Sequence, residues 1–544
     1  MDRLESPANS PPNGGTPPAD LPSLEPWHPK YNPWLIAVVV ALAAFMEVLD
    51  TSIANVALPY MAGSLGASTD ESTWVLTSYL VSNAIVLPMS GWVAGALGRK
   101  RFFMICLAIF TVSSLLCGIA PNLGAIILFR VLQGAGGGGL QPMAQAILAD
   151  TFPPEKRGLA FAVYGITVIF APTIGPTLGG WITDSYSWRW IFFINLPVGI
   201  VALLLISRLI EDPPWVKRAA GAGVRIDYIG VALLTIGVGA LQVMLDKGQE
   251  DDWFGSHFIL TLAVIAGVGL VSLVIWEWYQ KYPIVEVRLF KNLNFLGANL
   301  MMFIVGIMLF SSLVMMPLFL QTLMGYTSES AGLVLSGGSL VLLFLMPVIG
   351  ALSTKVQARY MIAFGWLALS FGMFYSTQRL DLEISFRSAS LLRIVQVVGF
   401  PFLFVPINLV SYVGMPLEKS GSVAGLINFM RNIGSSIGTS MVTTLLARRA
   451  QFHQVYLVAH VTPGRPGLAE AAAALAARLV ASGAQAEVAL SQTYGMLYRA
   501  LIAQATTLAY LDTFWILSVG AAIMCFFSFM LRRNQPGARR ASME

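Results

Sequence analysis

The chain has 544 residues, of which 56% are hydrophobic and only 11% are charged, a composition far from that of a soluble domain. Its formal net charge of +5 is modest, and the basic residues are spread over short segments between apolar runs, which argues against nucleic-acid binding. The three cysteines all lie within apolar runs, and no spacing of Cys or His predicts a disulfide framework or a metal site.

Fourteen apolar segments are long enough to cross a lipid bilayer as helices. The sequence therefore predicts an all-α polytopic membrane protein. Residues 1–32 are rich in Pro, Ser and Asn, lack the pattern of a signal peptide, and predict a disordered tail. The segments lie near 34–59, 73–95, 102–120, 123–149, 159–183, 189–209, 227–246, 257–278, 294–322, 330–354, 360–378, 389–412, 421–447 and 511–531.

Lysine and arginine gather in every second loop between these segments. The positive-inside rule places such loops, both termini and the tail 532–544 in the cytoplasm. The basic groups are Arg99, Lys100 and Arg101; Lys156 and Arg157; Lys217, Arg218 and Arg225; Lys281, Arg288 and Lys291; Lys355 and Arg359; and Arg532, Arg533, Arg539 and Arg540.

Short motifs recur in two parts of the chain at one offset, and parallel repeats of this kind mark secondary transporters. We expect an N-terminal six-helix half at 33–210, two inserted spans at 211–280 and a C-terminal six-helix half at 281–531. The repeated motifs are Arg130-x-x-Gln133 with Arg393-x-x-Gln396, and Pro153-x-Glu-Lys-x-Gly158 with Pro416-x-Glu-Lys-x-Gly421.

The segment 448–510 is unusually long for a connection between spans. Its Ala-rich part from Leu468 to Val480 predicts a helix that ends at Gly483, and a second helix from about residue 485 runs into the last span. One interpretation is a periplasmic helical hairpin that offers a surface to a partner. The other is a loop without regular structure.

Charged residues occur deep inside two of the predicted spans. Glu47 and Asp50 share one face of the first helix, and Asp50 lies roughly 14 Å inside the span end at Pro59, near the bilayer centre. Arg130 lies at a matching depth, roughly 12 Å from the start of the fourth span. Because intramembrane charge is costly, Asp50 and Arg130 are candidates for a proton-binding pair coupled to substrate. A static ion pair between helices is the alternative.

Other polar residues within the spans are open to two interpretations. Glu47 is either a second protonatable or cation-binding group or a permanently neutral core residue. Arg431 either lines a substrate cavity, together with Gln133 and Asn428, or satisfies backbone carbonyl groups.

Small residues and prolines in the fifth span predict close helix packing and a bend, and they include Gly175, Pro176, Gly179 and Gly180. Two glycine motifs match those of soluble enzymes, but they lie inside spans rather than after strands, which indicates packing glycines. No phosphate-binding loop, nucleophile–base arrangement or metal-ligand cluster is present in the sequence. It therefore predicts no enzyme, no cofactor and no use of ATP.

Four segments together resemble one known family. The run from Leu49 to Pro59 resembles the first-span motif of the fourteen-span drug:proton antiporter family of the major facilitator superfamily. The segment Arg130-x-x-Gln133-Gly134 is similar to the family's span-four motif. The segment Gly175-Pro-Thr-Leu-Gly-Gly180 is similar to its antiporter motif, and the run from Trp188 to Gly199 is similar to its span-six signature. The similarity extends from about Trp34 to the last span and is nearest to pumps of the EmrB type.

The resemblance implies a major facilitator fold with two six-helix halves and two inserted helices, and proton-driven export of hydrophobic or amphipathic compounds. It assigns Asp50 and Arg130 to proton coupling and gives the Gly175–Gly180 kink the role of sealing the bundle. It further implies the bacterial inner membrane, a periplasmic adaptor of the EmrA type and an outer-membrane channel of the TolC type. A dedicated exporter of one metabolite or signal molecule on the same fold is the alternative.

The loop between spans two and three departs from the family pattern. It carries Gly91, Gly98, Arg99 and Lys100, but Gly95 stands where the family commonly has an acidic residue. This removes the acid on which an inter-helix charge latch would be built. We therefore expect Arg99 and Lys100 to contact lipid phosphates or the ends of spans.

Overall fold

The computed structural model describes residues 29–216, 226–461 and 466–531, and all regular structure within these ranges is helical. The tail 532–544, most of the tail 1–32 and the basic residues Lys217, Arg218 and Arg225 lie outside the described residues.

The N-terminal half is built from six spans, two of which carry a short extra helix. The helices are α1 (Pro33–Leu65), α2 (Thr69–Ser72), α3 (Trp74–Leu97), α4 (Arg99–Gly118), α5 (Leu123–Thr151), α6 (Arg157–Ser185), α7 (Trp190–Phe193) and α8 (Asn195–Leu209). Local sequence explains the ends of α1: Asn32 accepts a hydrogen bond from the Trp34 amide at its start, and Gly66 takes a left-handed conformation at its end.

The rest of the chain forms two peripheral helices and a second half. The helices are α10 (Tyr228–Lys247), α11 (His257–Tyr279), α12 (Leu293–Thr322), α13 (Ser328–Leu352), α14 (Ala358–Arg379), α15 (Phe386–Val397), α16 (Gly399–Ser411), α17 (Ser420–His460), α18 (Pro466–Ala481) and α19 (Ala486–Phe527). Single 3-10 turns lie at Trp253–Gly255, Val287–Lys291, Leu417–Lys419 and Ser528–Met530.

Twelve spans in the described part of the chain are long and apolar enough to cross a membrane. Two further long helices, α14 and α17, are more polar and pack within the same bundle. Helix α14 packs against α16 and α19, and helix α17 packs against α12 and α3. The arrangement confirms an all-α membrane protein with about fourteen spanning segments.

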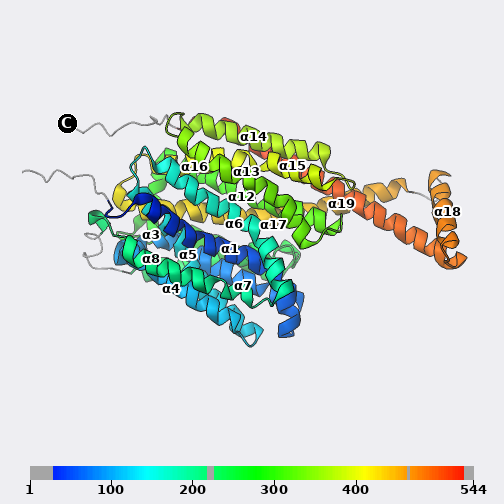
Figure 1. The fold of residues 1–544 in the computed structure, drawn as a ribbon, viewed down its shortest axis with the longest axis horizontal. Coiled ribbons are helices and arrows are strands. Elements are labelled where there is room, and N and C mark those ends of the chain that lie inside the picture. Colours follow the sequence, from blue (N-terminus) through cyan, green and yellow to red (C-terminus); the bar gives the residue numbers. More distant parts are fainter. Residues whose placement is uncertain (1–28, 217–225, 462–465, 532–544) are drawn as a thin grey trace, which may run out of the picture.

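The two halves lie side by side, with α1, α3, α4, α5, α7 and α8 on one side of Figure 1 and α12 to α16 on the other. They meet along two equivalent seams, α3 against α17 and α6 against α13. Both seams are close: a Cβ on Gly91 would lie 2.4 Å from the Ser422 Cα, and one on Gly350 would lie 2.9 Å from the Gly158 carbonyl oxygen. Small residues therefore let the halves touch through their backbones.

A helical arm extends from the bundle (Figure 1). It consists of the distal part of α17, the whole of α18 and the first part of α19. Helix α18 and the start of α19 lie where the sequence predicts them, whereas the extension of α17 to His460 was not predicted. Gly483 has a positive φ of 103° in the turn between α18 and α19. Ala472, Ala489 and Thr493 are buried where the two helices pack.

Candidate functional site

Asp50 and Arg130 form a buried ion pair between α1 and α5. The Arg130 Nη1 donates to the Asp50 Oδ2 over 2.6 Å, and both side chains are at most 1% exposed. The matching depth inferred from the sequence therefore corresponds to direct contact. A buried pair of this kind is stable only when further hydrogen bonds satisfy both partners.

Surrounding side chains and one backbone carbonyl supply most of those further bonds and form a polar cage, in which the Arg130 Nη2 has no partner among the described residues. The other Asp50 oxygen, Oδ1, accepts from the side-chain amides of Gln133, at 3.0 Å, and Asn195, at 2.7 Å. Arg130 also donates to the Gln133 Oε1 at 2.9 Å and to the Val75 carbonyl oxygen at 3.1 Å. The carboxylate is thus held by one cationic and two neutral donors.

Two members of the cage were not predicted as site residues. Asn195 begins α8 and also donates to the Ser114 Oγ of α4, at 3.0 Å, and the Tyr79 ring lies 4.3 Å from the Arg130 guanidinium. Asn195 lies within the span-six signature, so the motif contained the signal. Gln133, expected to line a substrate cavity, lies instead in the Asp50 cage and is fully buried.

Glu47 lies one helical turn before Asp50 and has its own set of neutral donors. Its Oε1 accepts from the Tyr79 hydroxyl and the Asn83 amide, each at 3.0 Å, and its Oε2 accepts from the Gln141 amide at 2.5 Å. No Lys or Arg of the described residues forms an ion pair with it. Tyr79 therefore connects the Glu47 carboxylate to the Arg130 cage.

A chain of hydrogen bonds continues from Glu47 across the interface between the halves. The Gln141 Oε1 accepts from Arg431 of α17, and the Tyr164 hydroxyl donates to Asn428, at 2.9 Å. Asn428 in turn donates to Gln145 at 2.5 Å. The structure thus brings Asn428 and Arg431 together with Glu47, and all of these side chains are buried.

The C-terminal half carries a copy of the Asp50 cage without its acid. Arg393 and Gln396 repeat Arg130 and Gln133, but Arg393 donates to Ser312, at 3.2 Å, where the first half has a carboxylate. Gln396 donates to the Ser376 Oγ at 2.8 Å. The Arg393 Nε has no partner among the described residues. The internal repeat therefore preserves the guanidinium but not the carboxylate.

In the predicted packing motif of α6, Gly175 and Gly179 lie against α1, whereas Gly180 does not. A Cβ on Gly175 would lie 2.2 Å from the Ser52 Oγ, and one on Gly179 would lie 3.0 Å from the Ile53 side chain. Both glycines thus allow α6 to approach α1, and the Ser52 hydroxyl donates to the Pro172 carbonyl oxygen at 2.9 Å. Gly180 faces open space.

The motif between α3 and α4 forms a contact between the halves. Arg99 pairs with Asp150 at the end of α5 and donates to the Ser420 Oγ at 2.8 Å, at the start of α17. Of the two contacts expected for Arg99, lipid phosphates or the ends of spans, the structure shows the second, and the acid that Arg99 contacts lies on α5 rather than at position 95. Lys100 does contact the end of a span, donating to the Ser207 carbonyl oxygen at 2.5 Å.

The turn before α4 is held by a second acid. A Cβ on Gly98, whose φ is 89°, would lie 2.7 Å from the Asp212 carboxylate, and that carboxylate accepts from the Lys100 amide at 2.8 Å. Asp212 therefore caps the start of α4.

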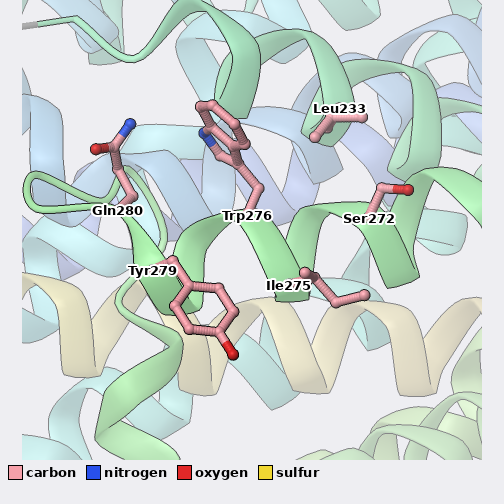
Figure 2. Close-up of a pocket in the computed structure, with 6 residues that line it drawn as sticks. All are labelled: Leu233, Ser272, Ile275, Trp276, Tyr279 and Gln280. Atoms are coloured by element: carbon pink, nitrogen blue, oxygen red, sulfur yellow. The ribbon is translucent and has the colours of Figure 1, made fainter.

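A surface groove lies apart from all of these charges. It has a volume of about 480 Å³ and runs between α10 and α11, where Leu233, Ile275, Trp276 and Tyr279 line it (Figure 2). Its walls are mainly apolar, and the groove includes none of the Asp50, Glu47 or Arg431 networks. We assign it no role in proton coupling.

Comparisons with known proteins agree with the fold. Residues 40–439 match the model of the Major Facilitator Superfamily. The chain is 39% identical to the Multidrug export protein EmrB of Haemophilus influenzae over 432 residues, 79% of this chain and 84% of that protein. It is 38% identical to the Fatty acid resistance protein FarB of Neisseria gonorrhoeae over 449 residues, 82% and 87% of the two chains.

Solved structures of low sequence identity share the fold. The proton:xylose symporter XylE, bound to 6-bromo-6-deoxy-D-glucose, superposes with a TM-score of 0.59 at 14% identity and covers 93% of this chain and 97% of its own.

Proposed function

Because the chain belongs to the Major Facilitator Superfamily, and within it to the group of the EmrB multidrug export proteins, we propose that it is a proton-driven multidrug exporter. The observation that carries this proposal is the buried Asp50–Arg130 pair inside its cage of neutral donors. A protonatable carboxylate at the centre of a membrane bundle is a functional group by default.

The cage suggests how a proton acts on the bundle. Protonation of Asp50 removes its charge and weakens its bonds to Arg130 of α5 and Asn195 of α8. Since these partners lie on different helices, the change alters helix packing rather than one side chain. Exchange of a proton for a substrate can then drive alternating access of a cavity between the halves.

We place the substrate cavity at the inter-half network of Gln141, Tyr164, Asn428 and Arg431. These side chains come from both halves and bond directly across the interface, so a substrate that separates the halves meets them first. Each proton that moves inward contributes about 2.3 kcal/mol per 100 mV of membrane potential, so one or two protons support a substantial substrate gradient.

We further propose a bacterial inner-membrane location with both termini in the cytoplasm, and a tripartite assembly with a periplasmic adaptor and an outer-membrane channel. The arm formed by α17, α18 and α19 supports this assembly, because it projects from the bundle and exposes apolar side chains such as Val455, Tyr494 and Tyr498. Deletion of residues 466–505 should abolish co-purification of the adaptor while vesicle transport persists. Retained co-purification would refute the assignment of the arm.

The experiment that tests the export function compares the wild type with Asp50→Asn in everted membrane vesicles. Dye efflux and the imposed pH gradient are followed together. We expect wild-type efflux to consume the gradient, and the variant to lose both signals while it still binds dye. Unchanged efflux in the variant would give Asp50 a structural role, and efflux of a single compound out of a broad panel would indicate a dedicated exporter.

A further inference from the structure

Arg431 is a buried cation with no carboxylate of the described residues in direct contact. It lies on α17 with 6% of its surface exposed, and no Asp or Glu of the described residues forms an ion pair with it. Its side-chain partners, Gln141 and Tyr164, are neutral, and the Phe404 ring lies 5.9 Å from its guanidinium. Arg130, by contrast, has Asp50.

The nearest acid in the network does not neutralise Arg431 directly. Glu47 is separated from it by the amide of Gln141, which donates to Glu47 and accepts from Arg431. The Glu47 oxygens already accept from Tyr79, Asn83 and Gln141. The carboxylate is therefore held by neutral donors on its own half of the protein, and it attracts Arg431 of the other half only across the intervening Gln141 amide.

A substrate carboxylate is a better partner for Arg431 than the Gln141 amide oxygen. An arginine and a carboxylate often form two parallel hydrogen bonds, which adds energy and geometric specificity over a single bond to an amide oxygen. The planar guanidinium also accommodates both oxygens of a carboxylate in one plane. Binding of such a group displaces one amide oxygen and leaves the bond from Gln141 to Glu47 in place.

The surroundings of Arg431 also suit the apolar body of an amphiphile. The Tyr164 and Phe404 rings lie 6.0 Å apart, and the Phe161 and Tyr412 rings stack at 5.5 Å in the same interface between α6 and α16. Aromatic rings next to a single cation bind a molecule with one anionic group and an alkyl or aromatic body.

We propose that Arg431 is the specificity-determining residue for amphiphiles that carry an anionic group, such as long-chain carboxylates, and that Glu47 opposes it by disfavouring that charge. The inference rests on the proposed export function and deepens it by naming a substrate class. Because the two residues carry opposite charges on the two sides of Gln141, their neutralisation shifts anion binding in opposite directions.

The test measures binding of three probes to the purified full-length protein by fluorescence titration: dansyl-undecanoate, its neutral methyl ester, and cationic ethidium. We expect the wild type to bind the acid about tenfold more tightly than the ester. Arg431→Gln should lose that preference, Arg431→Lys should keep part of it, and Glu47→Gln should tighten acid binding and weaken ethidium binding. The Arg431→Lys variant and the methyl ester separate loss of charge from misfolding. Arg431→Lys keeps the positive charge, and any variant that is still folded binds the ester.

Efflux from proteoliposomes separates this inference from the function on which it rests. Equal acid and ester affinities in the wild type, or an unchanged preference in Arg431→Gln, would overturn the inference even if ethidium is exported. A wild type that prefers the acid but exports neither the acid nor ethidium would refute the export function, while the role of Arg431 in binding stands.

Discussion

At the scale of single residues, the cage around Asp50 depends on a neutral amide as well as on the guanidinium. Asn195 contributes the shortest neutral bond to the Asp50 carboxylate, 2.7 Å, and ties it to Ser114 of α4. Asn195→Leu keeps the size of the side chain and leaves the carboxylate with one donor fewer. We expect proton-coupled efflux to fall about tenfold or more, measured as dye efflux in everted vesicles.

Asn299 offers a matched control for this prediction. It is another buried asparagine, and its side-chain amide donates to the Phe295 carbonyl oxygen of its own helix rather than to the cage. Asn299→Leu should therefore reduce efflux far less than Asn195→Leu. Equal losses in the two variants would show that any buried amide matters for folding, and that Asn195 has no special role in coupling.

The acid-free copy of the cage gives a second residue-scale prediction. Ser312 lies 3.2 Å from the Arg393 guanidinium, so Ser312→Asp should place a carboxylate beside a buried, unpaired cation. A charge-assisted bond of this kind contributes about 1.5–3 kcal/mol, so the thermal midpoint in detergent should rise by about 2 °C or more. The gain should vanish in the double variant with Arg393→Gln. A lower midpoint for Ser312→Asp alone would contradict the predicted pairing.

At the scale of the helices, the packing motif of α6 predicts two opposite outcomes five residues apart. Gly175→Ala would place a Cβ 2.2 Å from the Ser52 Oγ and 2.4 Å from the Ser52 Cβ, so α1 and α6 must separate. We expect a loss of about 1–3 kcal/mol of stability and reduced efflux. Gly180→Ala meets open space and gains helix propensity, so it should be neutral or stabilising. The thermal midpoints of both variants test this prediction. An unchanged midpoint for Gly175→Ala would refute close packing of α6 against α1 at Gly175.

Sequence reasoning succeeds where one physical signal dominates. Long apolar runs located the helices, because a membrane span needs about twenty apolar residues, and the Arg-x-x-Gln repeat located equivalent positions of the two halves. It did not locate the break between α7 and α8 at Ile194, which does not interrupt the apolar run. It also did not locate the continuation of α17 to His460, because the apolar run ends near Arg448 while the helix continues. The break at Ile194 starts α8 with the cage residue Asn195.

Side-chain partners from distant parts of the chain were the other gap. The sequence showed the depth of Asp50 and Arg130. It did not show that Asp150 is the acid that pairs with Arg99, because Asp150 lies on another helix. The family pattern places an acidic residue at position 95, within the same loop as Arg99. Only the packing of α4 against α5 reveals that a different helix supplies the charge.

At the scale of the whole molecule, the repeat makes the two seams between the halves equivalent. Gly91 faces Gly421 and Ser422 on one seam, and Gly350 faces Gly158 on the other. Their motifs correspond, so the internal repeat predicts contacts as well as helices. The seams differ in one respect: the α3–α17 side also carries the contact of Arg99 with Asp150 and Ser420. At the end of the bundle that carries Arg99, the charged pair of Arg99 and Asp150 thus joins the two halves through Ser420.

Opening of that end must break the Arg99 contact, which predicts the effect of removing its acid. Asp150→Asn weakens the hold of Arg99 on the start of α17, and we expect the population with this end open to rise about tenfold, a shift of about 1.4 kcal/mol. A reporter cysteine at Ser353, which is buried against Gly158 on the second seam, should then react faster with a membrane-impermeant maleimide in everted vesicles. Cys106, Cys117 and Cys525 are first replaced to leave one thiol.

Lys100→Gln provides the matched control. In the described part of the chain, Lys100 donates hydrogen bonds to Ser207 of α8 and to Asp212, both within its own half, and it forms none with the other half. The substitution removes a charge next to Arg99 without touching the contact between the halves, so labelling of the cysteine at position 353 should stay at the wild-type rate. Faster labelling in both variants would mean that general loss of charge loosens this end. Wild-type labelling in Asp150→Asn would mean that the glycine seams alone hold it closed, and that Arg99 is only a cap for α17.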